Sequence, residues 1–287
     1  MSDARSKTFI TVADLAAAVS AKRPVVLLDV RDKADPSINR PLIPGAVPAY
    51  LATDFSGPST PRDGSRPLPE IIDLQAKARQ WGINTDTLVV VYDESTGAQA
   101  GRGWWTLRWA GIENVRLLDG GLAAWKAAGH ATAAAPAASP PPGNIALSPG
   151  HMRTLDADQA AKLARDGVLL DARGRAAYVG GPAEAGKPPT GHIPGALSAP
   201  SAESVGADGR FKSTEDLRAR FAALGVDGDQ SVGVYCGSGN AASHLIAGLN
   251  AIGIDAPLYV GSWSAWSADP ARPVATGAGP GSGEKKA

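Results

Sequence analysis

The chain has 287 residues, which is enough for two compact domains, and its 28 Lys and Arg residues balance 28 Asp and Glu residues. A formal net charge of zero provides no overall field to hold a polyanion, so nucleic acid and acidic membrane surfaces are excluded as charge-driven partners. The single cysteine, Cys236, excludes an internal disulfide and a cysteine-cluster metal site.

The chain has no stretch near the roughly 18 consecutive apolar residues that a membrane helix needs, and residues 1–7 are polar rather than signal-like. We therefore expect a cytoplasmic, monomeric protein that makes no contact with a membrane. Its four histidines have no metal-ligand spacing, so we expect no metal and no bound cofactor.

The first half alternates short apolar runs with segments of helical period. Residues 25–31, 88–92 and 115–118 have the pattern of strands buried on both faces, whereas residues 69–81 space their apolar side chains three and four apart, as a helix does. Residues 131–150 then break the pattern with a dense run of Ala, Pro and Gly. Such a composition buries little apolar surface, so we expect a linker there and a disordered tail at 276–287.

The second half repeats the first. Its apolar runs at 168–171 and 232–235 predict strands, and residues 213–224 predict a helix with Ser213 as N-cap. Four segments of one half match four of the other in the same order, at a period of about 142 residues from Asp29 to Asp171. The sequence therefore predicts an α/β protein of two duplicated domains, each a mostly parallel sheet with helices on both faces.

The loop after residue 235 carries the strongest chemical signal. In such folds ligands lie beyond the carboxyl ends of the strands, and here the strand is followed at once by Cys236 and then by a helical stretch from 243 to 251. Glycines and small side chains allow backbone N–H groups to converge on the sulfur, which stabilises a thiolate. We predict Cys236 as a nucleophile, in a loop formed by the five residues Gly237, Ser238, Gly239, Asn240 and Ala241.

Cysteine-dependent phosphatases use similar chemistry, but they need an arginine six places after the cysteine to clamp the phosphoryl group. That position is Ala242, and residues 237–261 contain no Arg or Lys. A phosphatase is therefore excluded.

Taken together, these segments resemble the tandem rhodanese-domain sulfurtransferases of the thiosulfate/3-mercaptopyruvate type. The resemblance covers residues 8–275 and rests on the Asp-x-Arg pairs, on His-Ile-Pro-Gly-Ala at 192–196, on the cysteine loop and on the Gly-Ser-Trp segment at 261–263. It implies domain 1 at 8–130, a linker at 131–150, catalytic domain 2 at 151–275 and the tail at 276–287. Domain 1 is expected to be catalytically silent, because it has Asp93 where domain 2 has Cys236.

The resemblance also guides the interpretation of the polar residues. Asp171 and Arg173 recur in the first copy as Asp29 and Arg31, which favours a structural ion pair over a catalytic role. His192 is expected to be a hydrogen-bonded packing residue. The Ser238 hydroxyl has two open roles: to bind the donor or leaving group, or to stabilise the loop.

Donor recognition is where the sequence departs from the family. Mercaptopyruvate-type members hold the substrate carboxylate with an arginine at a position that is Ala177 here. The candidate substrate-binding residues are therefore Arg66, Arg175 and Lys187.

The resemblance implies a sulfurtransferase that takes a sulfane sulfur from thiosulfate or 3-mercaptopyruvate, carries it as a Cys236 persulfide and passes it to cyanide, a thiol or a thioredoxin-like acceptor. The alternative is a non-catalytic sulfur carrier or interaction module, in which Cys236 receives sulfur from a protein partner.

Overall fold

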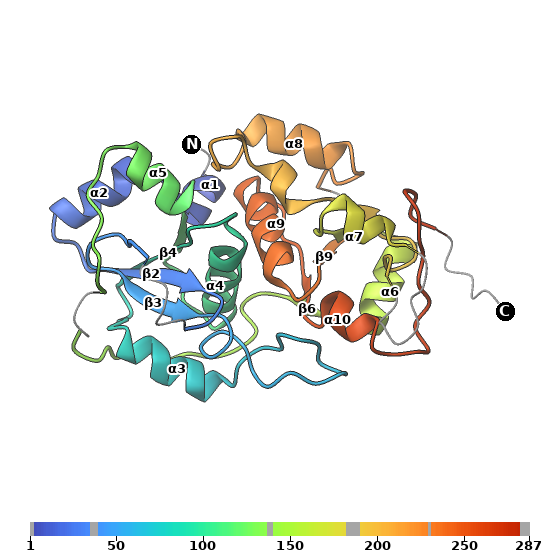
Figure 1. The fold of residues 1–287 in the computed structure, drawn as a ribbon, viewed down its shortest axis with the longest axis horizontal. Coiled ribbons are helices and arrows are strands. Elements are labelled where there is room, and N and C mark those ends of the chain that lie inside the picture. The colour runs from blue at the N-terminus through green and yellow to red at the C-terminus, as the bar shows by residue number, and fades with distance from the viewer. Residues whose placement is uncertain (1–2, 35–39, 137–139, 182–189, 229–230, 282–287) are drawn as a thin grey trace. The chain divides into compact units, whose positions relative to one another are not determined.

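The computed structural model of the protein describes residues 3–34, 40–136, 140–181, 190–228 and 231–281. The chain forms two compact units (Figure 1). Unit 1 comprises Met1–Gly57, Leu68–Met152 and Val205–Phe211, and unit 2 comprises Pro58–Pro67, Arg153–Ser204 and Lys212–Ala287. Each unit therefore includes a short segment from the other repeat.

Unit 1 contains a five-stranded sheet in the order β1-β5-β4-β2-β3, and every neighbouring pair is parallel. Its strands are β1 (Phe9–Ile10), β2 (Val25–Arg31), β3 (Val47–Tyr50), β4 (Leu88–Tyr92) and β5 (Val115–Leu118). Its helices are α1 (Asp3–Thr8), α2 (Val12–Ser20), α3 (Ile71–Gln80), α4 (Ala98–Trp109) and α5 (Gly121–Ala127).

Unit 2 contains a second parallel sheet in the order β6-β10-β9-β7-β8. Its strands are β6 (Thr154–Leu155), β7 (Val168–Asp171), β8 (Leu197–Ser198), β9 (Val232–Tyr235) and β10 (Leu258–Tyr259). Its helices are α6 (Ala157–Asp166), α7 (Arg175–Val179), the 3-10 turn η1 (Ser201–Ser204), α8 (Thr214–Ala222), α9 (Asn240–Ala251) and α10 (Ser262–Trp266).

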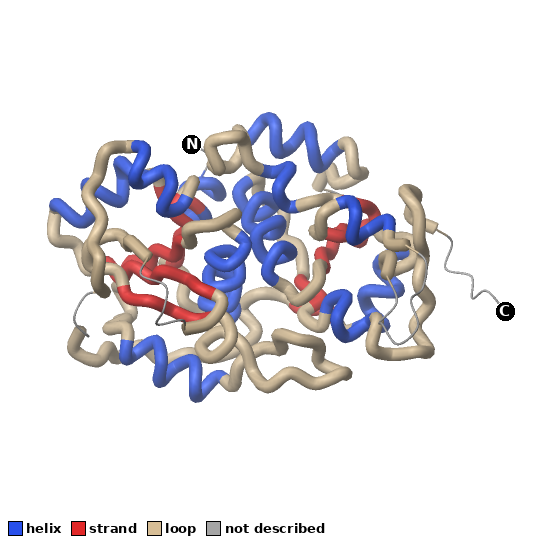
Figure 2. The backbone as a smooth tube through the Cα atoms, in the orientation of Figure 1, coloured by secondary structure: helices blue, strands red, loops and turns tan. Residues whose placement is uncertain are grey.

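The two sheets have the same strand order, which confirms the predicted fold class and the duplication. Alternation along each strand sends side chains to opposite faces of the sheet. In unit 1, Leu27 and Val90 pack against α2 and α5, whereas Val30 lies on the other face against α4, where its side chain approaches Gly103. Helices accordingly flank the strands of each unit (Figure 2).

The local signals in the sequence located the cap of one helix and, to within three residues, the start of another. The Ser213 side chain accepts a hydrogen bond from the amide of Asp216 at 3.0 Å, so the predicted N-cap is confirmed. The helix that follows the cysteine loop begins at Asn240, three residues before the expected Ser243. It starts early because Gly239 adopts the left-handed conformation and turns the chain directly from the strand into the helix.

Some residues of the segments expected to be linker and tail make backbone hydrogen bonds to the rest of the chain. Ile145 is buried, its amide donates to the Ile83 carbonyl at 3.2 Å, and Gly143 donates to Arg79 at 2.8 Å. Beyond residue 275, Gly277 donates to Val179 at 2.8 Å and Pro280 accepts from Gly195 at 2.7 Å. Backbone hydrogen bonds therefore hold these residues, although most of the described residues of both segments are exposed; the linker at 131–150 and the disordered tail at 276–287 stay predictions. The domain boundaries stay predictions.

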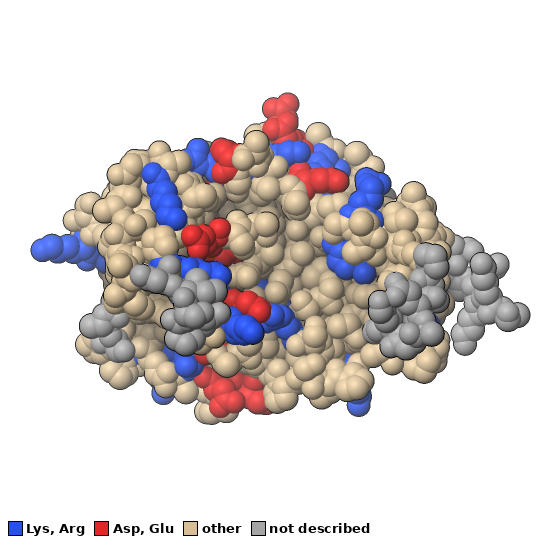
Figure 3. All heavy atoms as spheres, in the orientation of Figure 1, with Lys and Arg blue, Asp and Glu red and all other residues tan. Residues whose placement is uncertain are grey.

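The surface agrees with the balanced charge of the sequence. On the face in Figure 3, basic and acidic side chains lie interspersed among the described residues. Within those residues, no helix is both long enough and apolar enough to span a bilayer.

Candidate active site around Cys236

Cys236 lies directly after β9, a fully buried strand between β10 and β7. Its side chain is only 2% exposed, so the sulfur is shielded from bulk water. The chain then turns through Gly237 and Ser238 to Gly239, which has φ +91° and precedes the first residue of α9. The Gly239 amide donates to the Cys236 Sγ atom at 3.0 Å. An amide and a helix start are thus directed at the sulfur, an arrangement that favours negative charge there.

The first residues of helix α10 are hydrogen-bonded to this loop. The carbonyl of Cys236 accepts from the Trp263 amide at 2.8 Å, and the carbonyl of Gly237 accepts from the Ser264 amide at 3.0 Å. The Cys236 amide donates to the hydroxyl of Ser262 at 3.3 Å, and that hydroxyl donates to the Tyr259 carbonyl. These contacts fix the backbone on both sides of the sulfur.

The predicted ion pair between Asp171 and Arg173 is present beside the loop. Arg173 Nε lies 2.9 Å from Asp171 Oδ1, and Arg173 Nη2 donates to the Gly191 carbonyl at 2.6 Å. The guanidinium also stacks on the Trp263 ring, 4.6 Å from its centroid. Burial disfavours the cation, but the hydrogen bond and charge of Asp171 outweigh it and raise the pKa of Arg173. The pair anchors Trp263, whose amide holds the Cys236 carbonyl.

The corresponding loop of unit 1 contains Asp93, which is 3% exposed and follows β4. Its carboxylate accepts hydrogen bonds from the amides of Ser95 at 2.9 Å, Gly97 at 3.0 Å and Ala100 at 2.9 Å, and from the Ser95 hydroxyl at 3.2 Å. This loop therefore binds an anion, and the anion is the protein's own carboxylate.

Comparison with known proteins identifies both units. A family model of the rhodanese-like domain matches residues 11–128 and 156–269. The chain belongs to the rhodanese family.

Several relatives of this rhodanese protein match most of its length. It is 42% identical over 286 residues to a Mycobacterium tuberculosis protein, SseB, that has the provisional name thiosulfate sulfurtransferase; the match covers 96% of this chain and 99% of that one. It is 32% identical to the 3-mercaptopyruvate sulfurtransferase of Escherichia coli, over 84% of this chain and 86% of that one. The crystal structure of SseA from Escherichia coli, described as a 3-mercaptopyruvate sulfotransferase with the rhodanese fold, superposes with a TM-score of 0.74 at 28% identity, over 89% of this chain and 98% of that one.

The candidate donor-binding residues lie in different places. Arg66 is half-buried and belongs to unit 2, the unit that contains Cys236, although it comes from the first repeat. Arg175 is exposed at the first residue of α7. Lys187 lies outside the described residues. Whether any of the three contacts a donor stays a prediction.

His192 has the packing environment expected of it. It is fully buried, its Nδ1 atom lies 2.8 Å from the Tyr178 carbonyl, and its ring stacks on Tyr178 at 3.8 Å between centroids. Ser238 is half-buried and two places after Cys236, as Ser95 is two places after Asp93.

Two residues of the site, Ser262 and Ser264, were missed at the sequence level. The signal for them was the alignment of the two copies, in which Ser262 stands where the first copy has Gly121 and Ser264 where it has Ala123. At both positions the copy that contains the cysteine has a hydroxyl that the other copy lacks, and each hydroxyl makes hydrogen bonds in the structure.

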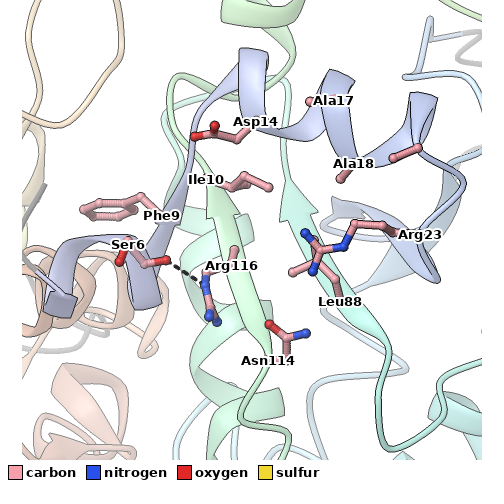
Figure 4. A pocket seen from close by; sticks show the side chains of 11 residues that line it. Ser6, Phe9, Ile10, Asp14, Ala17, Ala18, Arg23, Leu88, Asn114 and Arg116 are labelled. Atoms are coloured by element: carbon pink, nitrogen blue, oxygen red, sulfur yellow. Dashed lines mark hydrogen bonds between the residues drawn. The ribbon is translucent and has the colours of Figure 1, made fainter.

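A cavity of about 500 Å³ lies in unit 1 (Figure 4). Its walls come from α1, β1, α2 and the starts of β4 and β5, and they include Arg23, Asn114 and Arg116. Arg116 Nε donates to the Ser6 carbonyl at 2.8 Å, the dashed line in Figure 4. None of the described residues predicted for the sulfur site lines this cavity.

Proposed function

We propose that this protein is a sulfurtransferase that moves a sulfane sulfur from a small anionic donor, thiosulfate or 3-mercaptopyruvate, to a thiophilic acceptor through a persulfide on Cys236. The observation that carries the proposal is the amide of Gly239, 3.0 Å from the Cys236 sulfur at the carboxyl end of the central strand β9. The names of the relatives support the activity class.

The first step forms the persulfide. The Cys236 thiolate attacks the outer sulfur of the donor, so that a new S–S bond forms as the old bond to that sulfur breaks. With thiosulfate, the electron pair of the broken S–S bond leaves with sulfite. With 3-mercaptopyruvate, the electron pair of the broken C–S bond leaves as the enolate of pyruvate, which then takes up a proton.

The second step returns the thiolate. The acceptor, which is cyanide, a small thiol or a thioredoxin-like protein, attacks the outer sulfur of the persulfide, and the S–S bond breaks with its electron pair on Sγ. The negative charge stays on sulfur in the thiolate and on the outer sulfur in the persulfide. The amides of residues 237–241 stabilise both anions without an acid–base partner.

Donor binding requires further positive charge, because the donor and the nucleophile are both anions and must approach within bonding distance. We assign this role to Arg66 and Arg175, with Lys187 as a further candidate. Arg66 is the best supported of the three, since its neighbour Ser65 is hydrogen-bonded to Ser264, and the Ser264 amide donates to Gly237 in the cysteine loop.

A second candidate function is that of a sulfur carrier, in which Cys236 is loaded by a protein and small donors are irrelevant. A Thermus thermophilus relative, 32% identical over 82% of this chain, is named "Sulfur carrier protein TtuD". The two functions share the persulfide but differ in the source of sulfur. The cytoplasmic location stays a prediction, and a free thiol suits a reducing compartment.

One experiment separates the two functions. The full chain is incubated with each donor twice: without cyanide, to measure the intact mass of the protein, and with cyanide, to measure thiocyanate formation. We expect turnover with at least one donor and a protein heavier by one sulfur atom. A protein that stays unmodified by both donors would contradict the enzymatic function and leave the carrier.

A further inference from the structure

A loop from the first repeat belongs to the unit that contains Cys236. This loop, Pro58–Pro67, is called the inserted loop here. It is braced internally: the Asp63 amide donates to the Thr60 hydroxyl at 3.0 Å, and the Ser59 hydroxyl donates to the Gly64 carbonyl at 3.0 Å. These bonds close it into a compact turn, so it presents its tip, Gly64 and Ser65, in one conformation.

The tip of the inserted loop rests on the start of α10. The Ser65 amide donates to the Ser264 hydroxyl at 3.0 Å, and the Ser65 hydroxyl donates to the same oxygen at 3.2 Å. The Ser264 hydroxyl in turn donates to the Gly261 carbonyl at 3.0 Å. One hydroxyl therefore uses its proton and both of its lone pairs to join the inserted loop to α10.

The fit at this contact is close. A Cβ atom built on Gly64 would lie 2.5 Å from the Gly261 carbonyl oxygen and 2.8 Å from Ser264 Oγ, closer than real Cβ atoms approach. Gly64 also has φ +85°, which favours glycine. The absence of a side chain at Gly64 is therefore what lets Ser65 reach Ser264.

The same serine also holds the cysteine loop, because the Ser264 amide donates to the Gly237 carbonyl at 3.0 Å. Ser264 therefore contacts two segments directly. Its hydroxyl is hydrogen-bonded to the inserted loop, and its backbone amide is hydrogen-bonded to the cysteine loop. The first copy has Ala123 at the matching position and lacks this hydroxyl.

We propose that Ser264 is a positioning residue for donor recognition, which seats the inserted loop so that Arg66, next to Ser65, faces the anionic group of the donor. The inference rests on the proposed function, since it assumes that the donor is a small anion attacked by Cys236. The ligand class for this part of the site is the sulfonate end of thiosulfate or the carboxylate of a mercapto-acid. Ser264 contacts neither donor nor sulfur; it acts through Arg66.

The first test is Ser264→Ala in the full chain. We expect KM for both donors to rise about fivefold or more, while persulfide formation at saturating donor keeps its wild-type rate. Ser264→Thr, which retains a hydroxyl, should restore KM. Because Ser264 acts through Arg66, the double variant with Arg66→Ala should have the KM of Arg66→Ala alone. An unchanged KM in Ser264→Ala, or additive effects in the double variant, would overturn the proposal.

The second test uses a matched pair of glycines. Gly64→Ala and Gly209→Ala both place a side chain at positive φ, +85° and +76°, and both follow an Asp in short loops. A Cβ on Gly209 meets no atom within 4 Å, whereas one on Gly64 collides with α10. We expect KM to rise in Gly64→Ala and to stay at the wild-type value in Gly209→Ala. Equal KM values in the two variants would overturn the proposal.

The proposed function and the positioning role of Ser264 are contradicted by different results. If wild-type protein gains no sulfur by mass from either donor, the proposed function fails. If it gains sulfur but the KM of Ser264→Ala and Gly64→Ala equals that of wild type, only the positioning role of Ser264 fails.

Discussion

The loops after β4 and β9 occupy the same place in two sheets of identical strand order, yet only one contains a cysteine. Each loop ends in a glycine with positive φ, Gly97 at +82° and Gly239 at +91°, followed by a helix. In unit 1 the converging amides are satisfied by the Asp93 carboxylate. The anion-binding loop is therefore a property of the duplicated fold, and the two loops differ in the residue that directly follows the strand.

The two loops also differ in their support. Asp93 lies four residues before its glycine and Cys236 only three, so the cysteine loop is shorter. The helix that follows β5 begins at Gly121 with φ +56°, whereas the matching residue of α10, Ser262, has φ +52° despite its side chain. The backbone of Ser262 is thus strained, and in this conformation its hydroxyl accepts a hydrogen bond from the Cys236 amide.

The largest effect is expected from Cys236→Ser, which removes the thiol proposed as the nucleophile. The serine hydroxyl is too weak an acid to form the anion that the loop stabilises, so turnover should fall to background while the fold is retained. Intact mass after donor treatment and thiocyanate formation provide the measurement. A variant that still turns over would contradict the mechanism.

A smaller but severe loss is expected from residues 151–275 expressed alone. This fragment lacks the inserted loop, and with it the contacts to Gly261 and Ser264. It also exposes Phe211, which in the full chain stacks on Phe9 of unit 1 at 4.2 Å between centroids. We expect most sulfurtransferase activity to be lost, measured against full-length protein at equal concentration. Full activity in the fragment would make the first repeat dispensable.

Asp93→Ala tests the loop of unit 1 that corresponds to the cysteine loop. The change leaves three amides and one hydroxyl without their carboxylate, so we expect the free energy of unfolding to fall by about 2–4 kcal/mol. Because Asp93 has no thiol chemistry, turnover per folded molecule should stay close to wild type. Denaturant unfolding and donor kinetics are compared, with Asp93→Asn as the control that keeps an acceptor oxygen. Loss of turnover in folded protein would mean that unit 1 takes part in catalysis.

Ser262→Gly tests the strained serine. Glycine adopts φ +52° without strain, so the variant should be more stable than Ser262→Ala, while losing the hydroxyl should slow persulfide formation by about tenfold. Ser262→Ala keeps the strain and also lacks the hydroxyl, so it should be equally slow but less stable. Rapid-quench rates and thermal midpoints separate the two effects. Wild-type rates in both variants would show that the hydroxyl plays no part.

The smallest effect is expected from Ser238→Ala. Its counterpart Ser95 donates its hydroxyl to the Asp93 carboxylate, so Ser238 should donate in the same way to the charged persulfide. Removing one of several donors should lower the rate of sulfur release to cyanide by about threefold, with little change in donor KM. An altered KM with an unchanged rate would instead assign Ser238 to the donor.

The sequence by itself determined the duplication, the parallel α/β sheets, the Ser213 cap and the position of Cys236 at a strand end. These features depend on short-range signals: a two-face buried strand, a capping residue three places before its partner, and glycines directly after a strand. The alignment of the two copies also showed that Asp93 occupies the position of the cysteine in the first repeat.

Only the tertiary structure decided that the inserted loop belongs with Cys236, that Ser262 and Ser264 support the cysteine loop, and that residues near Ile145 and Pro280 are held in place. The physical reason is the same in each case. Composition reports how much apolar surface a segment can bury, but these segments are fixed by backbone amides, carbonyls and single hydroxyls whose partners lie far away in the chain. Such pairings depend on which segments the fold brings together, and no local pattern of residue types encodes them.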